Sequence, residues 1–393
     1  MKKHISIMAF CILFTVCVTA QMQKQSDTSI NHSARIIPVD KANLLKNVDF
    51  IANMQYANNS NFENGTYTGS AFAMNQFRME IKGLVFDSNV FFRFRDRYTR
   101  DPLPQTVDNI NHSVDMIFVG VNLSSKVSVA FGKMCADYGG YEFDANPIDI
   151  YQYNDIVEYA DNFLTGAQIS YSPVKSQQFT FQVLNARTQT FTEIYDSIPG
   201  VKAAQFPSAL VGNWRGSFWH GLFSTFWSYT FITEASHKYV KYIALGNQLS
   251  LKKLLIQYDF KYMMDDIDRL GLITSLIPTS YSPYTAMNTA YIEHWVHIQY
   301  TFAPKWDISI IGMVDNAYWN GNPDPNSGNQ IRTSWGVIPS LEFSPFAKLD
   351  LKFFGAYVGR YYDYTSYSKS EFGLANSTTG QIMVGFISPL VIL

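Results

Sequence analysis

Residues 78–100 read RMEIKGLVFDSNVFFRFRDRYTR, and apolar and charged side chains alternate along them. A period of two is that of a β-strand, in which successive side chains point to opposite faces. The tetrapeptide FDSN at residues 86–89 divides the stretch into two such strands, which predicts a β-hairpin. A two-residue turn at Asp87-Ser88 would set the opposed pairs, which are Lys82–Arg93, Glu80–Arg95 and Arg78–Arg97.

The same alternation recurs along the chain from about residue 48. It is clear in LLIQYDFKY (residues 254–262), KWDISIIGMV (305–314) and KLDLKFFGAY (348–357). Such strands have one apolar and one polar face, which suits a soluble sandwich as well as a membrane barrel. Strand length and the connections decide between these two architectures.

The connections between the expected strands are of two kinds. Short ones are FDSN (86–89), LSSK (123–126), YSPVKSQ (171–177), FAPKWD (302–307) and FSPFAKLD (343–350). Long ones, rich in Gly, Asn, Asp and Tyr, cover residues 57–72, 99–112, 134–162, 188–207, 263–290, 317–330 and 362–379. About sixteen strands of roughly 10 residues fit between them, the length that a tilted strand needs to cross a membrane. Residues 208–250 can be divided in more than one way, and Pro339 interrupts an expected strand.

The first residues have the pattern of a secretory signal, with Lys2 and Lys3, an apolar stretch, and VTA before Gln21. We expect a signal peptide at 1–20, a polar periplasmic lead-in at 21–47 and a barrel at 48–393. Short turns at one end, long loops at the other and an even strand number are typical of outer-membrane barrels. The chain is therefore predicted to be all-β, a closed antiparallel transmembrane β-barrel of about 16 strands in the outer membrane of a Gram-negative bacterium, in contact with lipid and lipopolysaccharide.

The charged face of the opening hairpin indicates a channel. Each basic side chain would cost about 2–4 kcal/mol if it faced lipid near the midplane, so this face must meet water while Phe92 and Phe94 face lipid. Since about sixteen strands enclose an aqueous channel, we predict a pore wall made of Arg78, Glu80, Lys82, Arg93, Arg95 and Arg97. The alternative, a solvated face of a soluble sheet, leaves the separation of short and long connections unexplained.

The third long connection, residues 134–162, is acidic and contains no Lys or Arg. Its acids are Asp137, Glu142, Asp144, Asp149, Asp155, Glu158 and Asp161. Long ordered loops usually have a function. We predict that this extracellular loop folds inward, where its acids would stand across the lumen from the arginines and set a transverse field at a constriction. A loop exposed at the cell surface is the alternative.

The signal, the arginine-bearing strands and FGKMCADYGGYEFDANPIDIYQYNDIVEYADNFLTG (residues 131–166) resemble outer-membrane porins of the phosphate-selective porin O and P type, in the branch common in gut anaerobes. The resemblance covers most of the mature chain and is specific at 78–100 and 131–166. It implies a 16-stranded barrel, usually a trimer, whose third loop constricts the channel and whose basic residues attract anions. Arg93, Arg95 and Arg97 correspond by position to wall cations, and 134–162 to the constriction loop.

One departure from that family bears on selectivity. In phosphate-selective members the constriction loop itself contributes basic residues, whereas here it is entirely acidic. This favours a porin for passive diffusion of small hydrophilic solutes or ions, with the arginine wall facing the acidic loop. An anion- or phosphate-selective porin is the alternative. We expect a homotrimer from the resemblance alone, and neither a cofactor nor a nucleic-acid partner.

An outer-membrane enzyme and a receptor built on a barrel are alternatives with weaker support in the sequence. His294 and His297 lie three apart on an expected strand and so point to opposite faces, which argues against a shared ligand sphere or a catalytic pair. NPDPNSGN (322–329) and MMDDID (263–268) offer oxygen ligands for calcium, but neither has the spacing of an EF-hand. We therefore expect no catalytic residues and no metal site. A receptor on a barrel would need a plug domain, for which residues 21–47 are too few.

Overall fold

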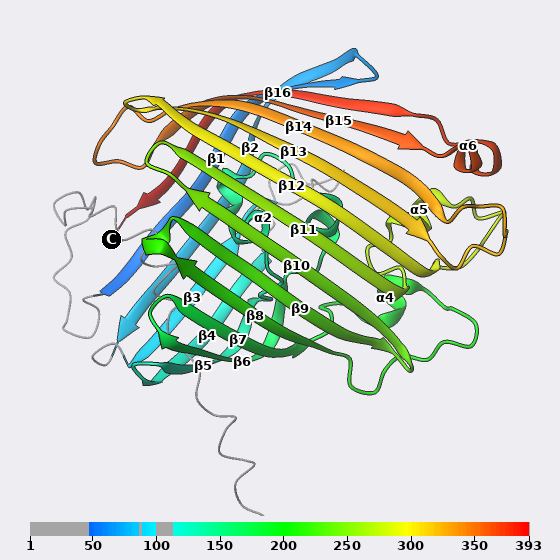
Figure 1. Cartoon of the computed structure of the whole chain (residues 1–393), viewed down its shortest axis with the longest axis horizontal. Coiled ribbons are helices and arrows are strands. Elements are labelled where there is room, and N and C mark those ends of the chain that lie inside the picture. Colours follow the sequence, from blue (N-terminus) through cyan, green and yellow to red (C-terminus); the bar gives the residue numbers. More distant parts are fainter. Residues whose placement is uncertain (1–46, 86–88, 100–112, 393) are drawn as a thin grey trace, which may run out of the picture.

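The computed structural model describes residues 47–85, 89–99 and 113–392. These residues form a closed barrel of sixteen strands, each antiparallel to its neighbours in the chain, and the first strand closes the ring by pairing with the last (Figure 1). The predicted fold class and strand number are thus confirmed. The signal peptide, nearly all of the lead-in, the Asp87-Ser88 turn and most of the long connection at 99–112 lie outside the described residues.

The strand bounds follow the expected alternation of turns and loops. The first eight strands are β1 (Asn47–Glu63), β2 (Thr66–Val85), β3 (Val90–Arg97), β4 (Ser113–Ser124), β5 (Val127–Cys135), β6 (Phe163–Val174), β7 (Gln177–Asn185) and β8 (Ser208–Phe218). The others are β9 (Phe223–Ala235), β10 (Lys238–Ser250), β11 (Leu254–Ile267), β12 (Met287–Ala303), β13 (Trp306–Trp319), β14 (Gln330–Phe343), β15 (Lys352–Tyr364) and β16 (Ser377–Val391). Residues 208–250 therefore hold three strands.

Three details differ from the sequence-based expectation. Strands run from 8 to 20 residues rather than roughly 10. The expected long loop at 57–72 is instead a continuation of the β1–β2 hairpin, which turns at Asn64-Gly65 with positive φ at both residues, as a two-residue hairpin turn requires. Pro339 pairs with Ile310 of β13, but the ladder between β14 and β15 is interrupted beside it, because proline has no N–H to donate.

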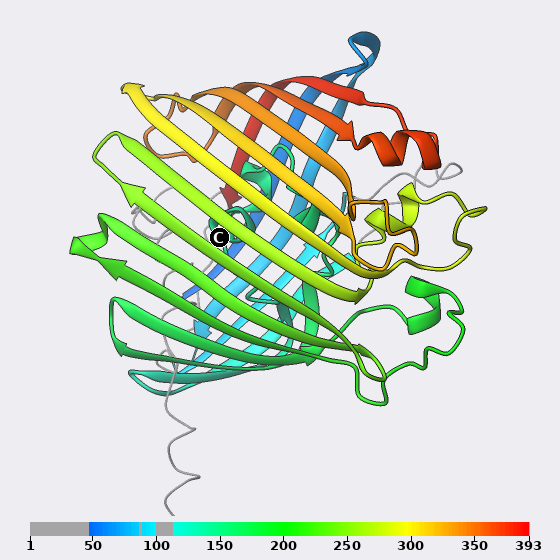
Figure 2. The ribbon, with the colours of Figure 1, turned by 45° about the vertical axis from the view of Figure 1, so that its right-hand side comes forward.

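Short helices occupy the connections on the long-loop side. They are α2 (Tyr141–Asp144), η3 (Pro147–Asp149) and α3 (Asp155–Tyr159) between β5 and β6, α4 (Phe191–Tyr195) before β8, α5 (Leu272–Leu276) before β12 and α6 (Ser366–Phe372) before β16; η4 (Trp219–Gly221) lies on the opposite side (Figure 2). Within the described residues, none of these helices has the length and apolar character that crossing a membrane requires.

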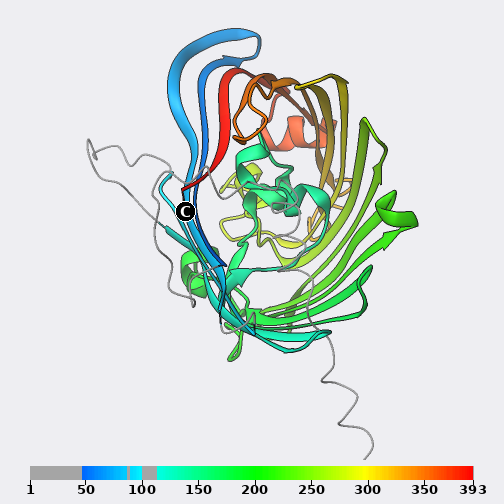
Figure 3. The ribbon, with the colours of Figure 1, turned by 90° about the vertical axis from the view of Figure 1, so that its left-hand side faces the viewer.

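The connection between β5 and β6, residues 136–162, lies within the ring of strands when the barrel is seen end-on (Figure 3). Its Ile148 is fully buried, and the side-chain amide of Gln55 on β1 donates to the Ile148 carbonyl at 2.8 Å. Gly140, just before α2, has φ 89°, and a Cβ there would stand 2.8 Å from Asp259 Oδ2 on β11. Glycine thus permits both the turn and the close approach to the barrel wall.

The inner face of the barrel is apolar over part of the ring. Along β13, Ile308 and Ile310 are 50% and 46% exposed on the outer face, while Ile311 and Met313 are buried on the inner face. Ile148 of the connection packs in one cluster with these two residues and with inner-face residues of β14 to β16. These inner apolar side chains are not exposed to water, because the connection packs against them and buries their surface.

Candidate functional site

The predicted pore wall lies on β2 and β3 with the expected register. Arg78 faces Arg97, Glu80 faces Arg95, and Lys82 faces Arg93. The outer-face phenylalanines alternate with the arginines along β3, as predicted from the period of two. The hairpin therefore places five cations and one carboxylate on one face of two adjacent strands.

Asp115 on β4 stabilises this face and was not predicted from the sequence. Its carboxylate is 1% exposed and forms ion pairs with Arg78 at 3.1 Å, Arg95 at 3.4 Å and Arg97 at 3.4 Å. A carboxylate between three guanidinium groups offsets the like-charge repulsion that their register imposes. The signal was present in the sequence, because Asp115 is the one acid in the strand SVDMIFVGVNLS (residues 113–124).

Two further acids complete the wall. Glu80 pairs with Arg93 at 3.1 Å and with Lys82 at 3.8 Å. Asp49 of β1 lies opposite Lys82 in the register of β1 and β2. The wall thus has five basic groups against three acidic ones, Asp49, Glu80 and Asp115, and keeps an excess of positive charge.

The loop acids mostly meet basic side chains on other strands. Arg215 of β8 binds Asp137 and Asp144, each at 2.9 Å. Lys352 of β15 binds Asp149 at 2.8 Å. The remaining contacts with basic residues are Glu142 with Lys261 of β11, and Asp155 with Arg332 of β14 and Arg360 of β15. Five of the seven predicted acids are therefore charge-paired with a wall other than the arginine wall.

The last two acids lie elsewhere. Asp161 accepts hydrogen bonds from the backbone and hydroxyl of Thr188, at 2.8 and 2.9 Å, and so joins this loop to the next one. Glu158 is exposed at the end of α3. The structure thus does not gather all seven acids on one surface facing the arginines, and whether the loop sets the narrowest point of a channel stays a prediction.

Five basic partners of the loop were not predicted from the sequence, namely Arg215, Lys261, Arg332, Lys352 and Arg360. Each contacts the loop inside the barrel and so stands on the inner face of its strand. The alternation in LLIQYDFKY and KLDLKFFGAY is consistent with this, because Lys261 and Lys352 lie on the polar face of those stretches. Nothing in the sequence says which acid each would meet, because the pairs are separated by up to 205 residues.

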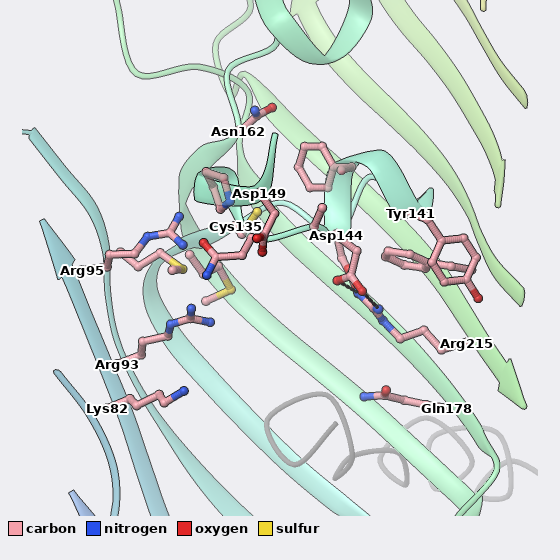
Figure 4. A pocket seen from close by; sticks show the side chains of 18 of the residues that line it. Lys82, Arg93, Arg95, Cys135, Tyr141, Asp144, Asp149, Asn162, Gln178 and Arg215 are labelled. Carbon is pink, nitrogen blue, oxygen red and sulfur yellow. Dashed lines mark hydrogen bonds and ion pairs between the residues drawn. The ribbon is translucent and has the colours of Figure 1, made fainter. Parts of the chain in front are cut away.

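A cavity of about 750 Å³ lies between the two sets of charges. Figure 4 shows Lys82, Arg93 and Arg95 on one side of it, and Asp144 joined to Arg215 on the other. Its charged lining comprises Lys82, Arg93, Arg95, Lys175, Arg215 and Lys352, and Glu80, Asp137, Asp144, Asp149 and Asp350. Burial raises the pKa of Asp137 above its ordinary value of 3.8, while the charge of Arg215 opposes that rise.

His294 and His297 point to opposite faces of β12 and have different partners. His294 Nδ1 lies 2.9 Å from the hydroxyl of Tyr258, and His297 Nδ1 lies 3.0 Å from Gln257 Oε1. Tyr258 and Gln257 are adjacent on β11 and so mark opposite faces, as predicted.

A family model described as "Phosphate-selective porin O and P" matches residues 48–386. The chain belongs to the phosphate-selective porin O and P family. The family and the closed barrel make the protein an outer-membrane channel of a Gram-negative bacterium. No curated protein sequence matches this porin.

Solved structures of other outer-membrane proteins share the fold of this porin. The channel DcaP of Acinetobacter baumannii has a TM-score of 0.57 at 11% identity, covering 86% of this chain and 96% of that one. OmpF of Salmonella typhi, in complex with daunomycin, has a TM-score of 0.56 at 14% identity, covering 86% and 97%. OmpT of Vibrio cholerae, in its trimer form, has a TM-score of 0.52 at 12% identity, covering 86% and 98%. At these identities the likeness concerns the fold alone.

Proposed function

We propose that this porin passes small hydrophilic solutes by diffusion and favours anions over cations. The observation that carries the proposal is the pairing of the loop acids that line the cavity, Asp137, Asp144 and Asp149, with Arg215 and Lys352. These cations offset much of the negative charge of the loop in the cavity, and the lining as a whole has six basic side chains against five acidic ones. The arginine wall on the other side keeps an excess of positive charge. This pairing supports the anion-preferring alternative over the general diffusion pore that the acidic loop sequence alone favoured.

The proposed path runs through the cavity between the arginine wall and the loop, with the loop as the constriction. The loop packs through Ile148 against the apolar inner face of β13 to β16, which leaves the side toward β2 and β3 for solutes. Solutes there would meet Lys82, Arg93 and Arg95, all of which line the cavity. Rings and rows of basic side chains are the devices that set anion preference in pores.

The test is the zero-current potential of the purified porin in a planar bilayer under a KCl gradient. The wild-type protein should give the sign of an anion-preferring channel, and the triple variant Arg93→Gln/Arg95→Gln/Arg97→Gln should shift the potential toward cations. Lys202→Gln removes one positive charge from an exposed residue outside the cavity and should leave the potential unchanged. A cation-preferring wild type would overturn the anion proposal, and folded protein without conductance steps would overturn the pore itself.

We also infer that the porin assembles as a homotrimer. The support is the family resemblance and the fold shared with OmpT of Vibrio cholerae, which has a trimer form. Light scattering after size-exclusion chromatography in detergent, corrected for bound detergent, measures the protein mass directly. A mass of one chain in several mild detergents would contradict the trimer.

A further inference from the structure

Eight buried charged side chains meet in the lumen where the loop touches β11 to β15. Their carboxylates are Glu142, Asp155, Asp259, Glu293 and Asp315, and their cations are Lys261, Arg332 and Arg360. None is more than 8% exposed. Five acids against three bases leave an excess of two negative charges, and an uncompensated charge is costly to bury.

Three of these carboxylates lie close together although they come from three separate elements. Asp155 is the first residue of α3, Glu293 lies on β12 and Asp315 on β13. One carboxylate oxygen from each lies within 4.8 Å of the other two. Arg360 lies beside two of them, 2.7 Å from Asp315 and 3.3 Å from Asp155, and Lys261 lies 3.5 Å from Glu293. These cations are shared with the other acids of the cluster, so the excess of two negative charges remains and the like charges still repel.

Two carboxylate oxygens of the group lack hydrogen bonds. Asp315 Oδ2 accepts from Arg360 at 2.7 Å and from Ser334 at 3.1 Å, but Oδ1 accepts no hydrogen bond from any residue that the structure describes. Glu293 Oε1 accepts from the Ile156 backbone at 2.5 Å, whereas Oε2 lacks a hydrogen bond in the same residues and lies 3.5 Å from Lys261 Nζ. Glu293 and Asp315 are only 1% and 2% exposed. Buried acceptors without donors require a partner.

We propose that Asp155, Glu293 and Asp315 bind one Ca²⁺ ion that fastens the loop to the barrel wall. Calcium takes oxygen ligands at about 2.3–2.6 Å in flexible geometry, so ligand atoms up to roughly 5 Å apart fit around it. Mg²⁺, at about 2.0–2.1 Å, demands a tighter octahedron, and Zn²⁺ prefers nitrogen and sulfur. Two positive charges also equal the excess of negative charge in the cluster.

The arginines around the group are compatible with such an ion. Asp155 binds Arg332 and Arg360, yet each carboxylate oxygen has two acceptor positions and can accept a hydrogen bond while it ligates a metal. Because Asp155 belongs to α3 and the other two ligands to the wall, the ion would link the loop to β12 and β13. Calcium should therefore restrict movement of the loop within the lumen.

Trp295 provides a reporter at this place. It stands two residues from Glu293 on the same face of β12 and is 2% exposed. Tb³⁺, which substitutes for Ca²⁺, emits when a nearby tryptophan is excited. Excitation of the purified porin, freed of lipopolysaccharide and treated with a chelator, should sensitise Tb³⁺ emission, and Ca²⁺ should displace it. Trp295→Phe should weaken the emission, with Trp335 opposite Val314 as a second donor, and should keep Ca²⁺ binding, measured by isothermal titration calorimetry.

The ligand variants Glu293→Gln and Asp315→Asn should each weaken Ca²⁺ binding at least tenfold, about 1.4 kcal/mol or more. Glu342→Gln is the matched control, since Glu342 is a lumen carboxylate that pairs with Lys352 outside the cluster. We expect one ion per chain with a Kd at or below about 10⁻³ M, as in extracellular calcium modules. Heat-modifiable mobility on gels verifies that each variant is folded.

Two results would overturn the site. Wild-type protein that binds no Ca²⁺ at about 10 mM, well above the range of extracellular modules, would mean that protons neutralise the excess charge. Equal Ca²⁺ affinity in wild type, Glu293→Gln and Asp315→Asn would place the ion elsewhere. The first result concerns the wild-type protein alone, so the proposal can be overturned even if a ligand variant fails to fold.

Discussion

Lys352 Nζ lies 2.8 Å from Asp149 Oδ1, which joins β15 to a loop whose own strands are β5 and β6. The pair is one of several ion pairs that attach the loop to the part of the barrel opposite β2 and β3. Asp149 is 39% exposed and Lys352 23% exposed, so solvent screens this pair more than the buried ones. Its contribution to stability should be about 1 kcal/mol or less, and its effect is expected on loop movement instead.

Removing this anchor should make the channel noisier. Lys352→Met removes the ion pair between η3 and β15, while Ile148 keeps its apolar contacts and Glu142 and Asp155 keep their own partners. We expect more frequent brief closures in single-channel recordings, with the mean conductance nearly unchanged. Asp149→Asn should give the same phenotype, and the double variant should add little to either. Additive effects would show that the two residues act independently.

Arg215→Gln should shift the selectivity of the channel toward cations. Arg215 binds both Asp137 and Asp144, and all three line the cavity. Losing the guanidinium leaves two acids in the cavity without this partner, which raises the local negative charge. The zero-current potential under a KCl gradient measures the shift, with Lys202→Gln as the charge-matched control. An unchanged potential would mean that Arg215 and these acids do not face the solute path, and a shift toward anions would contradict the prediction.

Acid pH should strengthen anion preference. Burial raises the pKa of Asp137 above 3.8, so this carboxyl takes up its proton at a higher pH than a free aspartate as the pH falls. Protonation removes one negative charge and leaves the positive charge of Arg215 in the cavity. The zero-current potential should therefore move toward anions as the pH is lowered, beginning above pH 3.8. In Asp137→Asn this step should be missing, while later changes from other carboxylates remain.

Gly140→Ala should destabilise the loop. The added Cβ would stand 2.8 Å from Asp259 Oδ2, and φ is +89°. The same carboxylate accepts the backbone N–H groups of Tyr141 and Glu142, at 2.9 and 2.8 Å, so moving it disturbs both. Loss of about 1–3 kcal/mol is expected. Gly200→Ala is the control, because Gly200 also has a positive φ, +77°, but meets nothing within 4 Å.

Limited proteolysis with increasing protease measures the Gly140 effect, since cleavage within 136–162 requires the loop to leave the lumen. Gly140→Ala should be cut faster than wild type and faster than Gly200→Ala. Equal rates in the two variants would mean that only the backbone angle matters and that contact with Asp259 does not.

Asp115→Asn should strongly destabilise the barrel. The change leaves Arg78, Arg95 and Arg97 without the carboxylate that they share, and two of these arginines are less than 10% exposed. Breaking a buried ion pair by removing one partner costs about 3–5 kcal/mol. The temperature at which heat-modifiable mobility is lost should fall clearly. Asp363→Asn, which breaks the exposed pair with Lys369, should change it little.

The opening hairpin shows how far the sequence reaches. The period of two determines which residues share a face, and the short turn determines the register, so the pairs from Arg78–Arg97 to Lys82–Arg93 follow from the local pattern alone. The alternation of short and long connections predicted a closed barrel of about sixteen strands, which the structure confirms. The prediction of a loop at 57–72 was wrong, because the exposed polar residues of a long hairpin have the same composition as a loop.

Charge pairing across the lumen belongs to the tertiary structure. The acids of residues 134–162 were visible in the sequence, but their neutralisation by Arg215 on β8, Lys352 on β15 and other basic residues was not. Strand alternation is a local property of the backbone, with a period that any short stretch displays. An ion pair between residues about two hundred positions apart depends on closure of the whole ring, and only that closure brings Asp155 to Arg360.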